Sequence, residues 1–349
     1  MSSPLLPCYR WSSGCMAPGR ILFLCVFAVA TGPLLAEASD EPSTSRQSLD
    51  EAWWTGPLLA ASPAILPQGH FLVEPYVFGS LVDGQYDSTG ARHSAARQND
   101  YGSLTYLEYG LTDSTTIGVI PRFAFNDPSQ GQSGSGLGVG DLTVQAAYGL
   151  SRFHDEGGPP TMSVVIGETL PTGRYDRLGT RLSDGVGAGA YATILSLYSQ
   201  YYLWMPNGRI LRTRLDVSES WSRDASIEDT SVYGTPQGFR GHASPGNSFN
   251  IDSAWEYSVT QHWVAALDVF YVDSGSTRVT GDYPPPRNGG SIPVSVQSES
   301  GSSKSFGLAP AVEYNWTSAV GVIIGAKIVT GGRNTSAAII PVTAINLVF

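Results

Sequence analysis

Charged residues in this sequence occupy alternate positions inside otherwise apolar segments. In "NSFNIDSAWEYSVT", Asp252 and Glu256 alternate with Ile251, Trp255 and Tyr257. A period of two is typical of a β-strand with one apolar and one polar face. Carboxylates gathered on the inner face of a closed sheet form rings of charge, and such rings bias which solutes pass. The chemistry that these residues suggest is therefore selection of a solute.

Projecting the polar set of every such segment inward gives the candidate lumen-lining residues. They are Glu74, Glu108, Arg122, Asp141, Arg212, Arg214, Asp216, Asp252, Glu256, Asp268, Lys304, Glu313 and Lys327. Carboxylates outnumber cations, which predicts a weakly cation-preferring or polar passage. The alternative, which we favour for any individual residue, is that opposite charges pair across the interior of the closed sheet and fill it.

Hydrolytic chemistry is a second alternative. His242 and Ser244 lie close together in "GHASPGN", and an outer-membrane hydrolase needs such a pair with a third group to orient the histidine. The neighbouring Gly, Ser and Pro residues are also the ordinary composition of a flexible loop. We therefore expect a protein that is not an enzyme, without catalytic, cofactor-binding or metal-ligating residues.

The elements that must position these side chains are about twelve alternating segments. They cover residues 69-82, 99-110, 115-126, 137-150, 161-171, 185-205, 209-222, 247-260, 262-274, 304-315, 319-329 and 337-349. Short links such as "LTDS" and "PNG" alternate with long polar links such as 223-246 and 275-303. This regularity predicts an all-β, antiparallel, up-and-down transmembrane barrel with short periplasmic turns and long outer loops.

The N-terminal region predicts export. Arg10 and Arg20 precede the apolar run "ILFLCVFAVA", and small residues follow at Ala36 and Ala38. This order predicts a cleaved signal peptide over 1-38, because the run is about half of the roughly 20 residues that a spanning helix needs. All three cysteines fall in this part of the chain, so we expect a mature chain free of disulfides and thiolate metal sites.

The next segment, 39-68, is rich in proline and apolar residues and carries Trp53 and Trp54. It could fold into the lumen as a plug or remain a periplasmic extension, and the sequence leaves both open. The barrel is expected over 69-349, in the outer membrane of a Gram-negative bacterium. The formal net charge of -10 argues against a nucleic-acid partner.

The chain ends on "AINLVF", in which Ile345, Leu347 and Phe349 alternate. We expect these three side chains to face lipid on the closing strand, which pairs with the first strand. Such an ending resembles the assembly signal of outer-membrane barrels. The expected partners are thus outer-membrane lipid, the barrel-assembly machinery and a small-molecule solute; the sequence gives no oligomeric state.

The stretch "WWTGPLLAASPAILPQGHFLVEPYVF" carries a family resemblance. Its Thr-Gly-Pro-Leu-Leu run, Leu-Pro-x-Gly step and Glu-Pro-Tyr motif resemble the start of outer-membrane transporters associated with the phenol meta-cleavage (MetA) pathway. The resemblance implies passive uptake of small molecules, aromatic or otherwise hydrophobic. A charged interior fits such a ligand poorly, since apolar ligands bind mostly apolar pockets. The rival expectation is a non-conducting structural or surface-interaction barrel.

The alternation also predicts side-chain orientation. The residues expected to face lipid are Ile117, Phe123, Trp255, Tyr257, Phe306 and Tyr314. Arginine in place of Leu308 is expected to cost about 2–4 kcal/mol near the membrane midplane. The substitution Glu256→Gln on the opposite face is expected to cost much less.

Overall fold

The computed structural model of the chain describes residues 46–154, 156–283 and 294–349. The predicted signal peptide, 1-38, lies outside the described residues, as does the start of segment 39-68. Within the described ranges, no helix is long and apolar enough to cross a membrane.

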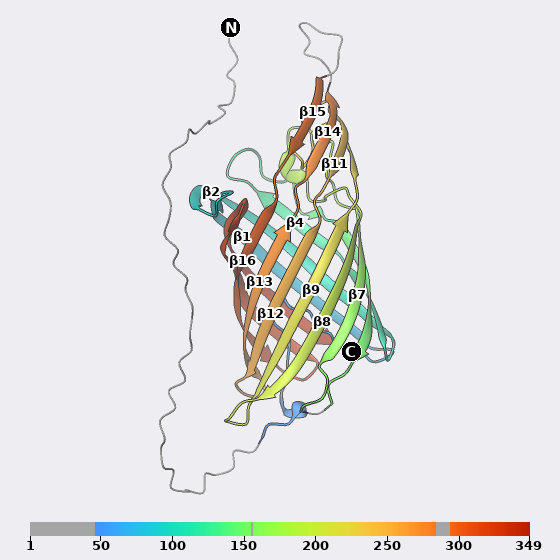
Figure 1. Cartoon of the computed structure of the whole chain (residues 1–349), viewed down its shortest axis with the longest axis vertical. Coiled ribbons are helices and arrows are strands. Elements are labelled where there is room, and N and C mark those ends of the chain that lie inside the picture. Colours follow the sequence, from blue (N-terminus) through green and yellow to red (C-terminus); the bar gives the residue numbers. More distant parts are fainter. Residues whose placement is uncertain (1–45, 155, 284–293) are drawn as a thin grey trace. The chain divides into compact units, whose positions relative to one another are not determined.

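The described chain forms a closed antiparallel barrel of twelve wall strands (Figure 1). The wall strands are β1 (Phe71–Tyr86), β2 (Arg92–Thr112), β3 (Thr115–Ile120) continued by β4 (Arg122–Asp127), β6 (Leu142–Ser151), β7 (Thr161–Leu170), β8 (Ala192–Trp204), β9 (Ile210–Ser222), β12 (Ser248–Ser258), β13 (Trp263–Ser274), β16 (Ser303–Asn315), β17 (Val320–Arg333) and β18 (Thr335–Val348). β1 pairs with both β2 and β18. Closure matters because lipid cannot satisfy the free backbone groups of a sheet edge. The predicted fold class is confirmed.

Pro121 separates β3 from β4 within one wall strand. Proline has no N–H to donate to a ladder; accordingly, β2 pairs with β3 below this residue and with β4 above it. The two-residue β5 (Gly138–Val139) pairs with the far edge of β4. β3 and β4 therefore act as one wall strand whose hydrogen-bond ladder is interrupted at Pro121.

The two faces of each wall strand differ sharply in residue type. In β13, Trp263 and Leu267 are exposed on the outer face, whereas Val264, Asp268 and Phe270 are buried on the inner face. Apolar side chains face outward because they contact lipid, and most polar side chains of the strand face the barrel interior. Of the residues expected to face lipid, three are exposed, Ile117, Trp255 and Phe306, and three are half-buried, Phe123, Tyr257 and Tyr314.

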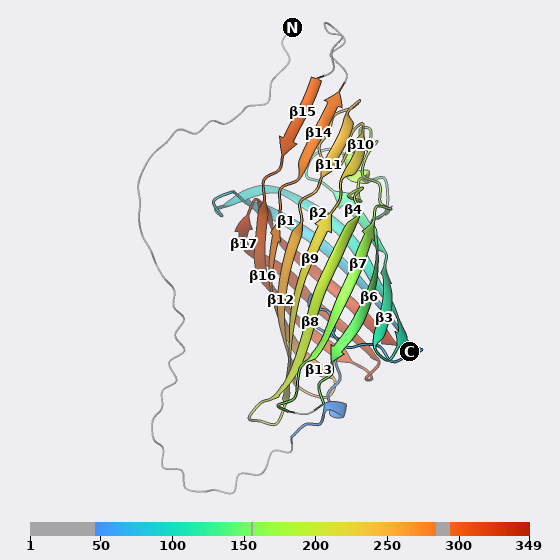
Figure 2. The same ribbon diagram turned by 45° about the vertical axis from the view of Figure 1, so that its right-hand side comes forward.

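A second, four-stranded sheet lies beyond the long-loop end of the barrel (Figure 2). It contains β10 (Ala225–Glu228), β11 (Arg240–Ser244), β14 (Arg278–Tyr283) and β15 (Val294–Glu299). Its core is formed by Ile227, Phe239, Ala243 and Val279. The sequence predicted long polar loops over 223-246 and 275-303 but not the pairing of strands inside them, because these strands are too short to show a clear alternation.

Several predicted boundaries differ from the observed ones. The segment predicted at 185-205 begins as a strand only at Ala192, and the one at 137-150 begins its main strand at Leu142. Glycine-rich residues before each strand form loop structure instead. The short 3-10 helices η1 (Leu49–Glu51) and η2 (Leu182–Asp184) lie outside the wall. β17 and β18 are joined by a tight turn at Asn334, whose φ is 49°, so one outer connection is short.

Candidate functional site

Residues 46–70, called the insert below, enter the barrel interior before β1 begins. The backbone N–H of Gln47 donates to the carbonyl of Gly208 in a short turn (3.0 Å). Further on, the N–H of Ala61 reaches the carboxylate of Asp216 in the middle of β9 (2.6 Å). The insert then returns, and Gly69 donates to Gly110 near the end of β2 (2.9 Å). It therefore rises from the short-turn end to about the middle of the barrel and descends again.

Asp268 on β13 binds the top of the insert through its backbone. The N–H groups of Leu58, Leu59 and Ala60 donate to this fully buried carboxylate at 3.1, 3.2 and 3.1 Å. Hydrogen bonds to an ionised acceptor are stronger than those between neutral groups. One side chain of the wall thus satisfies three consecutive amides that would otherwise be buried without a partner.

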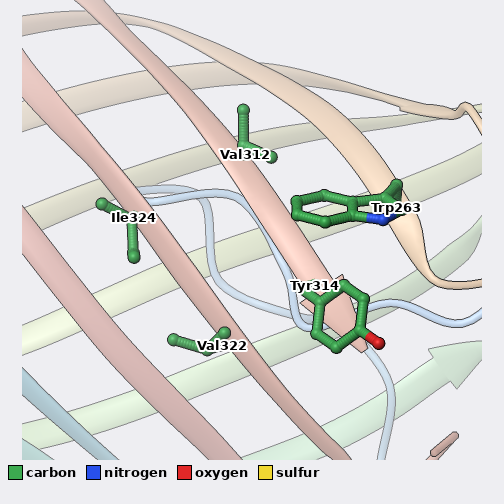
Figure 3. A pocket seen from close by; sticks show the side chains of 5 residues that line it. All are labelled: Trp263, Val312, Tyr314, Val322 and Ile324. Carbon is green, nitrogen blue, oxygen red and sulfur yellow. The ribbon is translucent and has the colours of Figure 1, made fainter. Parts of the chain in front are cut away.

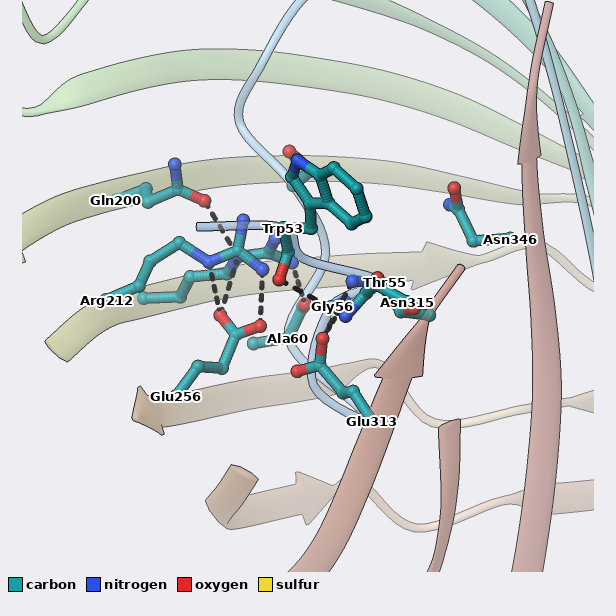
Figure 4. Close-up of polar contacts among 12 residues, drawn as sticks. Trp53, Thr55, Gly56, Ala60, Gln200, Arg212, Glu256, Glu313, Asn315 and Asn346 are labelled. Atoms are coloured by element: carbon teal, nitrogen blue, oxygen red, sulfur yellow. Dashed lines mark hydrogen bonds and ion pairs between the residues drawn. The ribbon is translucent and has the colours of Figure 1, made fainter. Parts of the chain in front are cut away.

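Glu313 on β16 binds the insert in the same way, nearer the short-turn end (Figure 4). Its Oε2 accepts the N–H groups of Thr55 and Gly56 at 2.7 and 3.2 Å. Asn315 adds two contacts, accepting the Thr55 hydroxyl at 2.9 Å and donating to the Trp53 carbonyl at 3.2 Å. The wall recognises the path of the insert mainly through main-chain atoms.

Side chains of the insert are accommodated by small residues on the wall. Leu58 packs in a buried cluster with Ala266, Ala309, Ala311, Ile323 and Ala344. A Cβ added at Gly325 would lie 2.6 Å from Leu58 Cδ1, closer than carbon atoms approach. The narrow inner surface here fits this leucine and leaves no room for a larger wall residue.

A buried ion-pair network joins β9 to β12 beside the insert. Arg212 binds Glu256 in bidentate fashion, with Nε to Oε2 at 2.7 Å and Nη2 to Oε1. Arg214 lies 3.6 Å from the same carboxylate and donates Nη1 to the carbonyl of Ala60 at 2.8 Å. The Arg212 guanidinium also stands 4.4 Å from the ring centroid of Trp54. Removing one member of such a network leaves an uncompensated buried charge, so the low cost expected for Glu256→Gln is revised below.

The other predicted residues on the inner face have different partners. Glu74 accepts a hydrogen bond from Asn346 at 3.3 Å and Glu108 accepts one from Gln145 at 2.9 Å. Arg122 projects from the inner face of β4 and is exposed, without an ion pair among the described residues. None of these three side chains forms a hydrogen bond or ion pair with a described residue of the insert.

One predicted lumen residue lies on the outer face, and another lies at the outer-loop end of the wall. Lys304 shares its face of β16 with the exposed Phe306 and forms an ion pair with Asp273 at 2.8 Å. Even-numbered residues of β16 face outward, so Lys304 lies on the outer face near the rim. Its predicted position in the lumen is therefore wrong. Asp141 precedes β6 and accepts the N–H groups of Gly173 and Ala188 at 2.8 and 2.7 Å. Asp141 therefore fixes an outer loop to the wall.

Residues missed from the sequence contribute to the same site. Asn315 and Gln200 lie at inner positions of their strands, and Gln200 accepts the Nε of Arg214 at 2.9 Å. Both share the parity of the inner face of their strands, but only charged residues were selected from the sequence as candidates. Trp54 was named in the sequence analysis only as part of an apolar, proline-rich segment, and no partner was predicted for it.

The outer wall carries an apolar groove of about 420 Å³, shown in Figure 3. Its lining residues are Trp263, Val312, Tyr314, Val322 and Ile324. The exposed members Trp263, Val312 and Ile324 share the lipid-facing parity of their strands. The groove thus belongs to the outer face, with aromatic side chains near the short-turn end, and is separate from the interior.

The chain closes on itself at its last residue. Phe71 and Phe349 exchange backbone hydrogen bonds at 3.1 and 2.9 Å. Ile345 and Phe349 are exposed and Leu347 is half-buried. The last ladder position is therefore occupied by the aromatic terminus.

The only His and Ser pair considered for hydrolysis shows no catalytic arrangement. His242 and Ser244 lie two positions apart on β11 of the outer sheet, and no hydrogen bond joins these two described residues.

A closed antiparallel barrel with an apolar outer face, short turns at one end and long loops at the other is a transmembrane β-barrel of the Gram-negative outer membrane. The chain belongs to the family described as "Putative MetA-pathway of phenol degradation", whose model matches residues 68–339. The resemblance seen in the sequence is thereby confirmed.

One solved structure shows the same fold, and others are similar at lower scores. An outer membrane channel from Pseudomonas putida F1 is similar with a TM-score of 0.61 and 16% identity, covering 83% of this chain and 98% of that chain. The toluene transporter TbuX of Ralstonia pickettii matches with a TM-score of 0.38 and 12% identity over 81% of this chain and 90% of that one. A search of curated proteins found no match.

Proposed function

We propose that this barrel mediates passive uptake of small molecules, aromatic or otherwise hydrophobic, across the outer membrane. Family membership supports the assignment, and one similar solved structure is that of an outer membrane channel. The observation that carries the proposal is the insert itself, because its backbone occupies the carboxylates of Asp268 and Glu313. A charged inner wall is then compatible with an apolar solute, since those charges are bound to amides.

In this proposal the insert is a plug that narrows the passage from the short-turn end. The wall residues that hold it are Asp216, Asp268 and Glu313, each through backbone N–H groups. The Arg212, Arg214 and Glu256 network supports the same wall. A plug held this way can restrict passage without any chemical step, and we propose that the protein is not an enzyme and uses no cofactor.

The surroundings of the barrel complete the proposal. The exposed outer face contacts outer-membrane lipid, and the terminal residues Ile345, Leu347 and Phe349 are read by the barrel-assembly machinery. The rival function, a non-conducting surface barrel, is favoured by one observation: two of the long outer links contain a folded sheet of β10, β11, β14 and β15. Such a surface is suited to contact with a partner.

Liposome swelling distinguishes the two. The full mature chain, a deletion of 39–67 and the double variant Asp268→Asn/Glu313→Gln are compared with the matched control Glu74→Gln/Glu108→Gln, whose carboxylates do not touch the insert. Uptake of 2-phenylethanol should exceed that of empty liposomes and rise when the insert is deleted or loosened, but not in the control. If neither the full chain nor the deletion variant admits any solute, the surface-barrel function replaces transport.

A further inference from the structure

One level of the inner wall combines aromatic rings with carboxylates on neighbouring strands. The ladders align Ser163 on β7 with Tyr198 on β8, Tyr198 with Asp216 on β9, and Asp216 with Asp252 on β12. Asp252 is in turn opposite Phe270 on β13. Directly opposed residues of antiparallel strands have Cβ atoms about 4.5–5.5 Å apart. We call these five residues the rung; it lies where the insert reaches its highest point, at Ala61.

The rung contains polar atoms whose hydrogen-bonding capacity is unused. Asp216 Oδ2 accepts the Ala61 N–H at 2.6 Å, whereas its Oδ1 is buried without a partner among the described residues. Asp252 Oδ1 and Ser163 Oγ are likewise buried and unpartnered there. Asp216 is 8% exposed and Ser163 only 1%. Buried polar atoms are rarely left unpaired, so such a group requires a partner from outside the chain.

The cations of the barrel do not satisfy these oxygens. Arg212 and Arg214 are committed to Glu256. Lys327 on β17 faces the rung, but its ammonium stands 4.2 Å from the Phe270 ring centroid and forms no ion pair within 4.0 Å with a residue of the described ranges. With Asp268 occupied by the insert, carboxylates remain in excess at this level.

We propose that the rung binds a protonated amine carried on an aromatic or apolar body, an inference that rests on the proposed uptake function and specifies its solute class. An ammonium group offers three N–H donors, and the opposed carboxylates of β9 and β12 offer it two free acceptors, Asp216 Oδ1 and Asp252 Oδ1. Tyr198 and Phe270 flank the two carboxylates and can contact the apolar body or the face of the cation.

A metal ion fits the rung less well. Among the described residues, no group of three His, Cys, Asp or Glu side chains is arranged to hold one. Two carboxylates flanked by aromatic rings present few ligands but a large apolar contact, which suits an organic cation. Asp252 as a residue is half-buried, whereas its Oδ1 is buried, so binding requires this carboxylate to turn toward the lumen.

Calorimetric titration of the full mature chain in detergent tests this directly. The probe is 2-phenylethylamine, which is protonated at pH 7, with 2-phenylethanol as its neutral counterpart. Asp216→Asn and Asp252→Asn should each weaken amine binding about tenfold or more, in line with the loss of a hydrogen bond to a charged group. The control Asp282→Asn, on the outer sheet, should bind like the parent chain. Lys327→Met should bind the amine more tightly, because a competing cation is removed.

Folding of each variant is checked by the heat-dependent shift of the barrel on SDS gels. Equal binding of amine and alcohol, no amine binding by the folded parent chain, or unchanged affinity in both aspartate variants would overturn the rung as an amine site. The increase for Lys327→Met separates recognition from a structural role, since damage to the wall would only weaken binding. If the titration shows no amine site but liposomes containing the protein still swell with 2-phenylethanol, the proposed uptake function stands and only the amine site is rejected. If the protein binds the amine but liposomes do not swell, only the uptake function is rejected.

Discussion

Two parts of the inner wall treat charge in opposite ways. On β9, β12, β13 and β16, buried carboxylates bind arginines or the backbone of the insert, as Glu256 and Asp268 do. On β1 and β2, Glu74 accepts a bond from the amide of Asn346 on the neighbouring β18, and Glu108 accepts one from the amide of Gln145 on β6, across β3. The first wall is completed by another segment of the chain, whereas the second is largely self-sufficient. The role of a carboxylate inside a barrel can therefore be assigned only when the group that donates to it is known.

The largest expected effect is at the centre of the first wall. Glu256→Gln leaves Arg212 and Arg214 buried without their carboxylate and should destabilise the barrel by about 3–5 kcal/mol. The matched change Glu108→Gln on the second wall removes a single neutral-donor contact and should cost about 1 kcal/mol or less. Urea unfolding in detergent micelles measures both. Similar costs at the two positions would erase the distinction between the walls.

The outer face gives the next largest effect, independent of the insert. Leu308 is exposed near the middle of β16, and Leu308→Arg should cost about 2–4 kcal/mol at the membrane midplane. Trp316→Arg, at the end of the strand, should cost about 0–1 kcal/mol. The comparison uses reversible unfolding from lipid vesicles. A lower cost at Leu308 than at Trp316 would mean that the assigned membrane position is wrong.

Contact between the first wall and the insert can be weakened selectively. Asp268→Asn replaces one carboxylate oxygen with an amide nitrogen that cannot accept, and it removes the charge that strengthens three bonds. The amides of Leu58, Leu59 and Ala60 should exchange with solvent about tenfold faster or more, in line with losing a hydrogen bond to a charged group. Hydrogen exchange read by mass spectrometry on peptides covering 54–64 measures this change. Asp83→Asn at the rim serves as the control, and equal protection in both variants would contradict the assigned role of Asp268.

The smallest effect concerns an outer loop away from both walls. The backbone N–H of Ser135, at 2.7 Å, is the main cause that lowers the pKa of Asp184 below its usual 3.8, and Arg181 and Arg174 add to it. Because the folded pKa is the lower one, this contact contributes fully above pH 3.8 and is lost as the pH falls through the folded value.

Pepsin cleavage near Ser135 should therefore accelerate relative to the Asp184→Asn variant only below pH 3.8. The ratio of the two chains at each pH cancels the pH dependence of the protease itself. A ratio that is constant with pH would show that the contact does not hold the loop.

The alternation of side chains was enough to predict the barrel, its closure and the outward residues, because lipid imposes the same requirement on every strand. It was less reliable at strand ends: Lys304 was placed inside although its even number matches Phe306. The site itself could not be predicted from side-chain pattern. Asp268 and Glu313 are bound by backbone N–H groups, which nearly every residue possesses, so the sequence of the insert carries little sign of its partners. The rung likewise depends on strand register, which residue types alone do not fix.

The insert and the carboxylates that bind it are far apart in the sequence, so they are not made at the same time. Ala61 is 155 residues from Asp216, Leu58 is 210 from Asp268 and Thr55 is 258 from Glu313. The insert is synthesised early, yet its last acceptor, Glu313, follows only when nearly the whole chain has been made. Contacts so distant in sequence form slowly, because a long loop must be closed before they contribute. Until then the amides of Thr55, Leu58 and Ala61 lack the carboxylates that accept them in the folded barrel.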